Sequence, residues 1–226
     1  MVYIRFYPDS PHIWRIAITK KTGVKNSMKY LLLATNNIGK LREIQAILEN
    51  LGIQLLTPKD AGIQLEVVED GETYAANAAH KALAFARASN LPSLSDDSGL
   101  EVDALGGAPG LHSARFSPKP GATDSDRRAL LLQCLQTYPR PWWARFHCTV
   151  ALATPDGWVG FAEGNCPGEI IPVERGQNGF GYDPIFLVVE KGLTMAELDM
   201  EAKNKLSHRA RAVRAAIPLI REKLSS

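Results

Sequence analysis

The sequence contains little cysteine and no long apolar run, and both shortages argue against whole classes of protein. Its 226 residues include three cysteines, which form no CxxC pair and have no spacing typical of a zinc site: Cys134, Cys148 and Cys166. This pattern argues against a disulfide framework and predicts reduced, buried thiols in a cytoplasmic protein. Because no apolar stretch approaches the ~18–20 residues of a membrane span, we expect no membrane partner.

An excess of charge of one sign is also missing. The chain has 26 Lys and Arg against 24 Asp and Glu, a net charge of +2. Residues 1–27 carry five of the basic residues and one acidic residue, so the rest of the chain is slightly acidic, with 21 basic and 23 acidic residues. A nucleic-acid-binding protein spreads positive charge over a folded face. We therefore expect no nucleic-acid partner.

The first 27 residues do not resemble a secretory signal. Their apolar segment, residues 13–18, is short and interrupted by Arg15, whereas a signal needs a continuous apolar stretch of ~7–15 residues. Met28 stands directly before a long apolar run. We expect residues 1–27 to be an N-terminal extension and residues 28–226 to form a single domain. An additional N-terminal strand is the alternative.

Hydrophobic periodicity predicts alternating strands and helices, which indicates an α/β fold. Strands are expected over residues 30–34, 53–56, 145–153, 158–164 and 185–189. Helices are expected over residues 40–51, 73–89 and 124–138, near 195–198 and from 207 onward. Residues 96–120 contain many glycines and prolines and are expected to be loop-rich.

Residues 34–40, with the sequence ATNNIGK, join a predicted strand to a predicted helix. The unpaired N–H groups of a helix N-terminus suit phosphate, and the segment adds side-chain donors and the charge of Lys40. It is not a Walker loop, because Ala34 and Leu41 stand where that motif needs Gly and Ser or Thr. A polar helix cap is the alternative interpretation.

Acidic side chains form a second candidate site at Asp96 and Asp97. Adjacent carboxylates repel, so they stay ionised together when a cation or water shares the site. Mg²⁺ is such a cation and also binds phosphate oxygens. Glu69 is a possible further ligand. The alternatives are an Asp-rich turn and a solvated acidic loop.

Three other segments carry candidate binding residues. Asn77 and Lys81 share one face of an alanine-rich helix. The glycines of residues 176–184, GQNGFGYDP, suggest a flexible loop that presents Phe180 to a flat ligand, with a nearby aspartate as hydrogen-bond acceptor. Ser207 is a predicted N-cap, which places His208 and Arg209 in the first turn of a helix. Basic side chains there interact unfavourably with the helix dipole, and an acceptor-rich ligand would offset that cost.

Together these segments resemble the inosine/xanthosine triphosphate pyrophosphatases, a family that hydrolyses non-canonical purine nucleoside triphosphates. The matching blocks lie in order along residues 29–214: ATNNIGK, the Asn77–Lys81 helix, DDSGLEVDALGGAPG, ARFHC, GFGYDPIF and KNKLSHR. The resemblance implies an elongated mixed sheet flanked by helices, with two lobes and a central cleft, and a homodimer. It also implies Mg²⁺-assisted hydrolysis of ITP, dITP and XTP to the monophosphate and pyrophosphate, which cleanses the nucleotide pool.

The resemblance also implies residue roles. The triphosphate is bound by Thr35, Asn36, Asn37, Ile38, Gly39 and Lys40. Glu69 and Asp97 hold the metal, and Asp97 is the catalytic base that accepts a proton from water. The other substrate-binding residues are Lys81, Ser98, Phe180, Gly181, Tyr182, Asp183, Lys203, His208 and Arg209. Among these, Phe180 stacks on the purine.

One position departs from the family pattern, because Ala76 replaces the glutamate that often precedes the asparagine of this helix. Two other functions stay open at this point. A related enzyme could act on pyrimidine triphosphates, and a protein that only senses nucleotides or binds RNA could use the same scaffold. Asp97, Glu69 and Lys40 argue against loss of catalysis, and a panel of triphosphates would decide between the enzymes.

Overall fold

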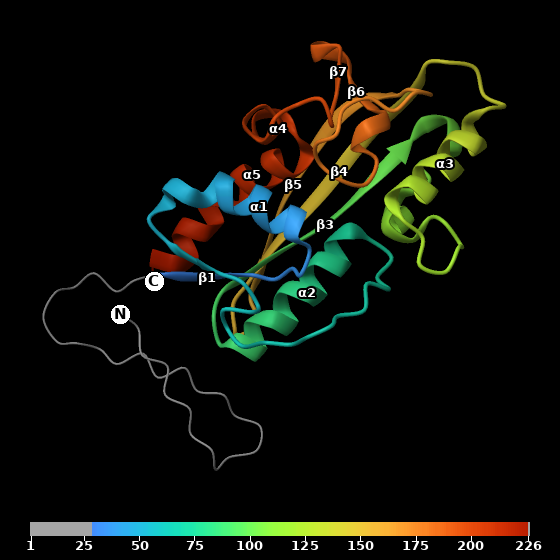
Figure 1. Cartoon of the computed structure of the whole chain (residues 1–226). Coiled ribbons are helices and arrows are strands. Elements are labelled where there is room, and N and C mark those ends of the chain that lie inside the picture. Colours follow the sequence, from blue (N-terminus) through green and yellow to red (C-terminus); the bar gives the residue numbers. More distant parts are fainter. Residues whose placement is uncertain (1–28, 226) are drawn as a thin grey trace, which may run out of the picture.

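The computed structural model describes residues 29–225, so the predictions for residues 1–27 and for a domain start at Met28 lie outside the described residues. One mixed sheet of seven strands runs through the molecule in the order β2-β1-β3-β4-β5-β6-β7 (Figure 1). Its strands are β1 (Tyr30–Leu33), β2 (Gln54–Leu56), β3 (Ser93–Val102), β4 (Trp142–Ala153), β5 (Val159–Ile170), β6 (Phe186–Val188) and β7 (Leu193–Thr194). The helices are α1 (Ile38–Leu48), α2 (Tyr74–Ser89), α3 (Asp124–Leu135), α4 (Met200–Leu206) and α5 (His208–Ser225).

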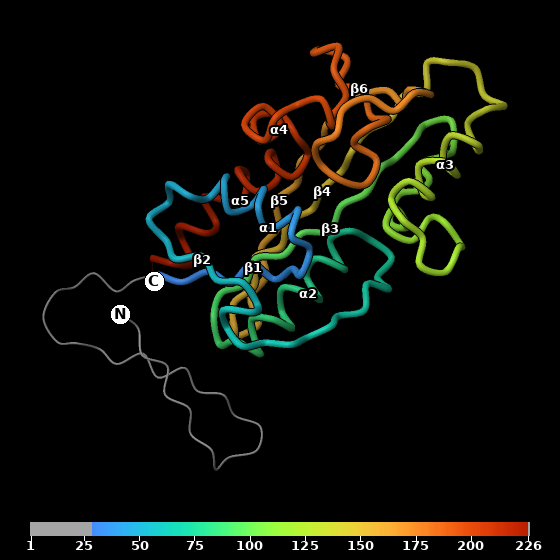
Figure 2. Tube along the Cα trace, in the orientation of Figure 1, coloured from blue at the N-terminus to red at the C-terminus, as the bar shows by residue number. Residues whose placement is uncertain are grey.

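The long strands β4 and β5 form the backbone of an elongated molecule. They pair antiparallel over twelve residues each, and β3 pairs antiparallel along the other side of β4. The short strands β1 and β2 pair in parallel at one end of the sheet (Figure 2), and β6 and β7 extend it at the other (Figure 1). The sheet is therefore parallel at one end and antiparallel along the rest of its length.

Alternation along β4 gives the sheet two different faces. Even-numbered residues from Trp142 to Leu152 point into two hydrophobic cores, whereas Ala151 and Ala153 pack under α2 on the opposite face. Figure 1 shows α1, α4 and α5 on one side of the sheet and α2 on the other. We call these the α5 face and the α2 face.

Two cores along the α5 face make two lobes. The first lobe contains β1, α1 and α5, packed around buried residues such as Leu31, Ile44 and Val213. The second lobe contains α3 and the segment from β6 to α4, packed around Trp142, Phe186 and other buried residues. The α/β class and the mixed sheet flanked by helices are therefore as predicted.

Side-chain caps explain where the helices begin. Asn37, Thr73 and Asp199 each accept a hydrogen bond from the backbone N–H three residues later, at the starts of α1, α2 and α4. Thr123 and Asp126 form a complete capping box at α3. Ser207 Oγ accepts from the N–H of Ala210, so the predicted cap of α5 is present.

Two predictions about local structure were wrong. Asp96 and Asp97 lie in the middle of strand β3, not in a loop, because β4 supplies an antiparallel partner for each residue from Ser93 to Val102. The helix expected near residues 195–198 begins at Met200, because Met195 and Leu198 are buried in the core of the second lobe instead. None of the described helices is long and apolar enough to cross a membrane.

The short length of β1 creates the feature that positions the site. Its pairing with β3 ends where the N–H of Ala34 donates to the carbonyl of Leu94, at 2.7 Å. Beyond Leu94, β3 has no strand neighbour on that side within the described chain until Glu101 meets Pro109. In open α/β sheets, ligands bind beyond the carboxyl ends of parallel strands, which is the location of this gap.

Candidate active site

The segment after β1 lies at this gap and forms the N-terminus of α1. Thr35 is buried, and its Oγ1 accepts from the N–H of Asn37 at 3.2 Å. Asn37 Oδ1 in turn accepts from the N–H of Lys40 at 3.1 Å, so the polar-cap interpretation is correct for Asn37. Asn36 and Ile38 are exposed. The segment therefore presents an open helix N-terminus beside β3, as a phosphate site requires.

Asp97 points to the α2 face, where its carboxylate is held on both oxygens. The side-chain amide of Asn77 donates to Oδ2 and the N–H of Ser98 donates to Oδ1, each at 2.9 Å. Burial raises the pKa of Asp97, nearby Glu69 raises it further, and the bond from Asn77 opposes both. A carboxylate with a raised pKa is a better proton acceptor than an ordinary exposed aspartate.

Glu69 reaches the same place from the loop before α2. Its carboxylate pairs with the ammonium of Lys81, and its backbone carbonyl accepts from Arg115 at 2.9 Å. Asn77 also holds this loop, since its Oδ1 accepts from the N–H of Gly71 at 2.7 Å. Asn77, which was expected only to share a helix face with Lys81, thus connects the acidic loop to Asp97.

The residues near Asp97 fit a hard cation, although three acidic or metal-ligating side chains do not cluster anywhere in residues 29–225. Glu69 lies close enough to raise the pKa of Asp97, and a cation between two carboxylates would relieve that repulsion. Two protein carboxylates plus water and phosphate oxygens are the usual ligands of Mg²⁺. Ala76 stands one residue before Asn77 and supplies no further carboxylate.

Asp96 points to the α5 face, so the two adjacent carboxylates do not share one site. Its Oδ2 lies 3.0 Å from both Lys40 Nζ and Arg209 Nε. Burial raises the pKa of Asp96, but Lys40 and Arg209 outweigh burial and hold the pKa well below its usual range. The expected shared cation is thus incorrect for Asp96, whose charge is neutralised by side chains of this chain.

Glu43 completes the ion-pair network on the α5 face. Its carboxylate pairs with Arg209 through one oxygen and with Lys203 through the other, at 2.7 Å for Lys203. Arg209 also donates to Ser98 Oγ at 2.9 Å. The motifs predicted no role for Glu43. Its position three residues after Lys40, on the inward side of α1, was the available signal.

Phe180 covers this network from the second lobe. Its ring lies 4.9 Å from Lys203 Nζ and 5.6 Å from the guanidinium carbon of Arg209. A Cβ atom at Gly39 would lie 2.7 Å from the ring, so the absence of a side chain lets Phe180 approach the first turn of α1. A flat aromatic face beside two cations and a helix N-terminus suits a purine that carries phosphates.

Asp183 anchors the same loop. Its Oδ2 accepts from the N–H of Phe180 at 2.9 Å and from Lys203 Nζ at 2.7 Å. Burial raises the pKa of Asp183, and Lys203 opposes that shift. Asn178 ties the same loop to the segment before α4, because its backbone N–H donates to the carbonyl of Ala196 and its side-chain amide to the carbonyl of Leu198.

His208 and Tyr182 are placed differently from the other predicted site residues. His208 is buried against the ring of Phe146, 4.7 Å between centroids, and its Nδ1 has no hydrogen-bond partner among residues 29–225. Burial lowers the pKa of His208 far below its usual value, so the imidazole is neutral. The Tyr182 hydroxyl donates to the carbonyl of Ser113 at 2.9 Å.

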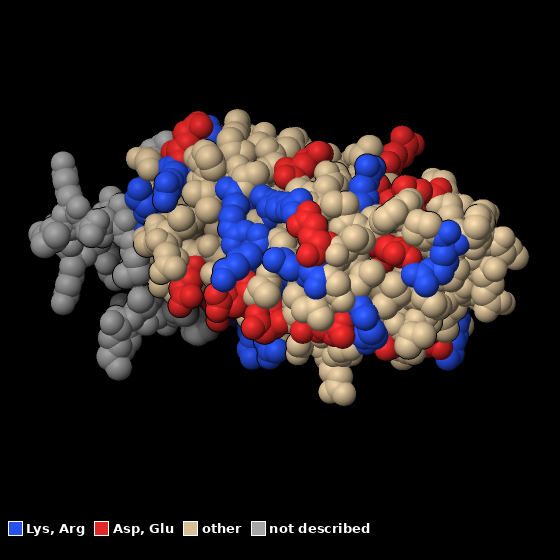
Figure 3. Space-filling view, turned by 90° about the horizontal axis from the view of Figure 1, so that it is seen from above, with Lys and Arg blue, Asp and Glu red and all other residues tan. Residues whose placement is uncertain are grey.

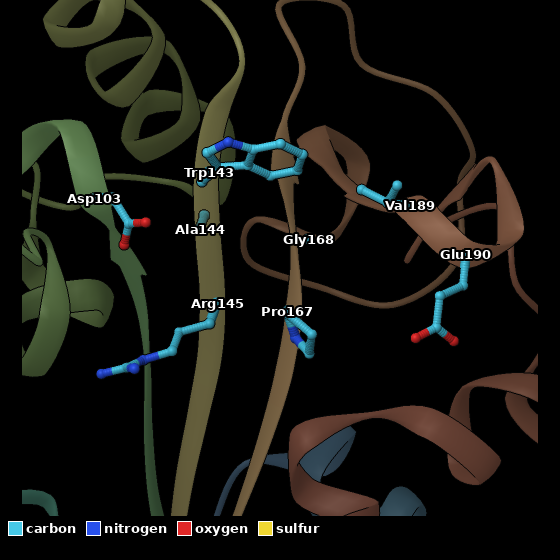
Figure 4. Close-up of a pocket in the computed structure, with 8 residues that line it drawn as sticks. All are labelled: Asp103, Trp143, Ala144, Arg145, Pro167, Gly168, Val189 and Glu190. Atoms are coloured by element: carbon cyan, nitrogen blue, oxygen red, sulfur yellow. The ribbon is translucent and has the colours of Figure 1, made fainter.

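An open pocket lies away from this site. It has a volume of about 350 Å³ on the α2 face of the second lobe, and its lining includes Trp143, Arg145, Pro167 and Val189 (Figure 4). No titratable group of the site described above lines it.

The surface seen in Figure 3 carries Lys and Arg gathered near its middle with Asp and Glu beside them, so its charge is mixed.

Comparison with known proteins agrees with this geometry. A family model described as the Ham1 family matches residues 31–219. The chain belongs to the Ham1 family. A dITP/XTP pyrophosphatase of Desulforamulus reducens is 47% identical over 191 residues, which cover 84% of this chain and 94% of that protein. A dITP/XTP pyrophosphatase of a Nostoc species is 48% identical over 200 residues, which cover 88% of this chain and 97% of that protein.

Solved structures of Ham1 proteins share the fold. A HAM1 protein from Coxiella burnetii is 37% identical with a TM-score of 0.77, covering 88% of this chain and 100% of that chain. The Staphylococcus aureus Ham1 protein is 34% identical with a TM-score of 0.75, and the match covers 86% of this chain and 100% of that chain. The family resemblance predicted from the sequence motifs is therefore confirmed.

Proposed function

We propose that this Ham1 protein is a nucleoside-triphosphate pyrophosphatase that converts dITP, ITP and XTP to the monophosphate and pyrophosphate. One observation carries the proposal: acidic and basic groups flank the gap beside β3 on both faces of the sheet. Asp97, Glu69 and Lys81 lie on the α2 face, and Phe180, Lys203 and Arg209 lie on the α5 face. A nucleotide that crosses the gap places its phosphates near the first group and its base near the second.

The reaction requires water to attack a phosphorus atom that is surrounded by negative charge. Mg²⁺ held by Glu69 and Asp97 would supply charge neutralisation and orient the phosphates. Asp97, whose pKa burial raises, deprotonates the attacking water. Lys40 and the N–H groups that begin α1 bind the triphosphate, and Lys81 stabilises charge on the leaving pyrophosphate.

Base selection follows from the donors beneath Phe180. Hypoxanthine and xanthine carry an acceptor oxygen at position 6, where adenine has an amine donor. The side chains of Lys203 and Arg209 have only donors. They can therefore pair with the oxygen at position 6, but they offer no acceptor to the amine of adenine. A pocket built on hydrogen bonds can reject the wrong partner by ~10⁴–10⁵. His208, whose Nδ1 has no partner among residues 29–225, is a further candidate for contacting the base.

The test is pyrophosphate release from a panel of triphosphates in Mg²⁺. We expect turnover of ITP, dITP and XTP, with ATP and the pyrimidine triphosphates at least a hundredfold poorer in kcat/KM. Asp97→Asn serves as the matched control and should retain nucleotide binding with turnover reduced by at least a hundredfold. Equal kcat/KM for ATP and ITP, preference for a pyrimidine, or binding of ITP without turnover would each contradict the proposal.

We also propose that the protein is a cytoplasmic homodimer. The cysteines are free thiols, which suits a reducing compartment. The second lobe leaves the side chain of Trp143 49% exposed on the open α2 face, in the pocket of Figure 4, where a second copy would bury it. Light scattering should give twice the 24.7 kDa chain mass, and Trp143→Glu should reduce it to one chain. A monomer at micromolar concentration would contradict the dimer.

A further inference from the structure

Helix α3 holds the backbone of the residue that follows Phe180. The N–H of Gly181 donates to Asp124 Oδ2 at 2.7 Å, and the carbonyl of Gly181 accepts from Arg128 Nη1 at 2.8 Å. Both backbone groups of one residue are thus bound by side chains more than 50 positions earlier in the sequence. Gly181 has a φ of +62°, a conformation in which glycine meets no steric penalty.

The helix that supplies these two side chains is itself firmly placed. Leu131 and Leu135 are fully buried in the core of the second lobe, and the capping box at Thr123 fixes the first turn. Burial raises the pKa of Asp124, but hydrogen bonds from Arg127 and from Gly181 outweigh burial and hold the pKa below its usual value. Asp124 is therefore ionised, and its bond to the Gly181 N–H is charge-assisted.

We propose that Asp124 and Arg128 are positioning residues for base recognition. They fix Gly181 and so hold the adjacent Phe180 ring over Lys203 and Arg209, ready to stack on the purine. The inference rests on the proposed function, since it names how that base site is built. A loop with three glycines would otherwise lose conformational freedom on binding, and a loop that is already ordered avoids that cost.

The position of α3 limits what the two residues affect. The phosphate-binding groups come from α1, α2 and β3, and no hydrogen bond or ion pair connects Asp124 or Arg128 to Lys40, Lys81 or Asp97 within the described residues. Loss of the α3 contacts should therefore weaken binding of the base and leave binding of the phosphates unchanged.

The chain offers a matched pair of variants for the test. Arg128→Gln removes the contact with the Gly181 carbonyl and also an ion pair with Glu174, at 2.8 Å. Glu174→Gln removes the same ion pair and leaves Arg128 in place to bind Gly181. Inorganic tripolyphosphate, which has no base, serves as the probe of the phosphate site.

We expect Arg128→Gln to raise the KM for ITP by roughly five- to tenfold, the effect of one lost hydrogen bond, with kcat within about twofold. The inhibition constant of tripolyphosphate should stay within about twofold, and Glu174→Gln should behave like the wild type. Hydrogen exchange of the amides of residues 179–182 should be faster in Arg128→Gln than in either of the other two proteins.

Three results would overturn the inference: an unchanged KM, equal weakening of ITP and tripolyphosphate, or unchanged hydrogen exchange over residues 179–182. Equal weakening of both ligands would mean that Arg128 only supports the fold. If the wild type does not hydrolyse ITP, the proposed function fails, while the exchange measurement still decides whether α3 orders the Phe180 loop.

Discussion

Asn77 donates a 2.9 Å hydrogen bond from its side-chain amide to the carboxylate of Asp97, across 20 residues of sequence. The same amide accepts from the N–H of Gly71 at 2.7 Å, and Asn77 is only 1% exposed. One buried side chain therefore fixes the orientation of Asp97 and the position of the loop that carries Glu69. Because Asn77 holds Asp97 and the loop that carries Glu69, its loss should affect the chemical step.

Replacement of Asn77 by Ala should lower kcat for ITP by roughly tenfold to a hundredfold, which is typical for the loss of a residue that orients metal-binding carboxylates. The KM should change less, because the base site lies on the other face of the sheet. His80→Ala, on the exposed side of the same helix, should match the wild type. Steady-state kinetics in saturating Mg²⁺ checks this, and an unchanged kcat in a folded Asn77→Ala protein would disprove it.

Replacement of Gly39 by Ala should raise the KM for ITP by roughly tenfold or more. The added Cβ would lie 2.7 Å from the Phe180 ring, so the ring must move away from α1. Turnover of ITP, compared with that of Ala46→Ser on the exposed side of α1, measures the effect. If Gly39→Ala binds ITP as well as the control does, the ring does not stack where we place it.

His208 predicts a pH dependence of stability. Burial, with help from Arg209 and Lys203, keeps the folded-state pKa far below 6.5, whereas the unfolded chain takes up a proton near pH 6.5. Below that pH the unfolded state binds more protons than the folded state, so this contribution to stability is complete above pH 6.5 and is lost as the pH falls. The slope is at most about 1.4 kcal/mol per pH unit.

Urea unfolding of the wild type and of His208→Gln at pH 7.5 and 5.5 tests this dependence. Between pH 7.5 and pH 5.5 the free energy of unfolding should fall by about 1 kcal/mol more in the wild type than in the variant. The other titrating groups are common to both proteins. Equal losses in the two proteins would show that folding does not lower the pKa of His208.

The roles of Asp96 and Asp97 show how far the sequence alone could lead. The motifs taken together identified the family, and the resemblance assigned Glu69 and Asp97 to the metal and Lys81 to substrate binding. The structure brings these three residues together. The division of the two carboxylates between opposite faces was missed, because the glycines nearby suggested a loop. A strand alternates its side chains, so recognition of β3 would have separated Asp96 from Asp97.

The contacts of Gly181 and Asn77 could not have been predicted from spacing. Asp124 and Arg128 reach Gly181 only because the two cores place α3 beside the second lobe, and no local pattern records that contact. Asn77 was visible as a polar residue on an alanine-rich face, but its two partners come from a loop and a strand whose positions depend on the whole fold. Helix and strand locations, by contrast, follow from short-range periodicity, which explains why most of them were correct.

Deletion of residues 1–27 should leave ITP hydrolysis within about twofold at physiological salt. Every residue of the proposed site lies between Thr35 and Arg209, and the family match begins at residue 31. The five basic residues of the extension could attract a triphosphate from a distance, but 0.15 M salt screens charges separated by more than about 8 Å. We therefore expect a modest gain in kcat/KM from residues 1–27 only at low salt. Kinetics of both proteins at 0.02 and 0.15 M NaCl tests this, with circular dichroism to verify folding. A large loss at the higher salt in a folded truncation would show that the extension belongs to the active site.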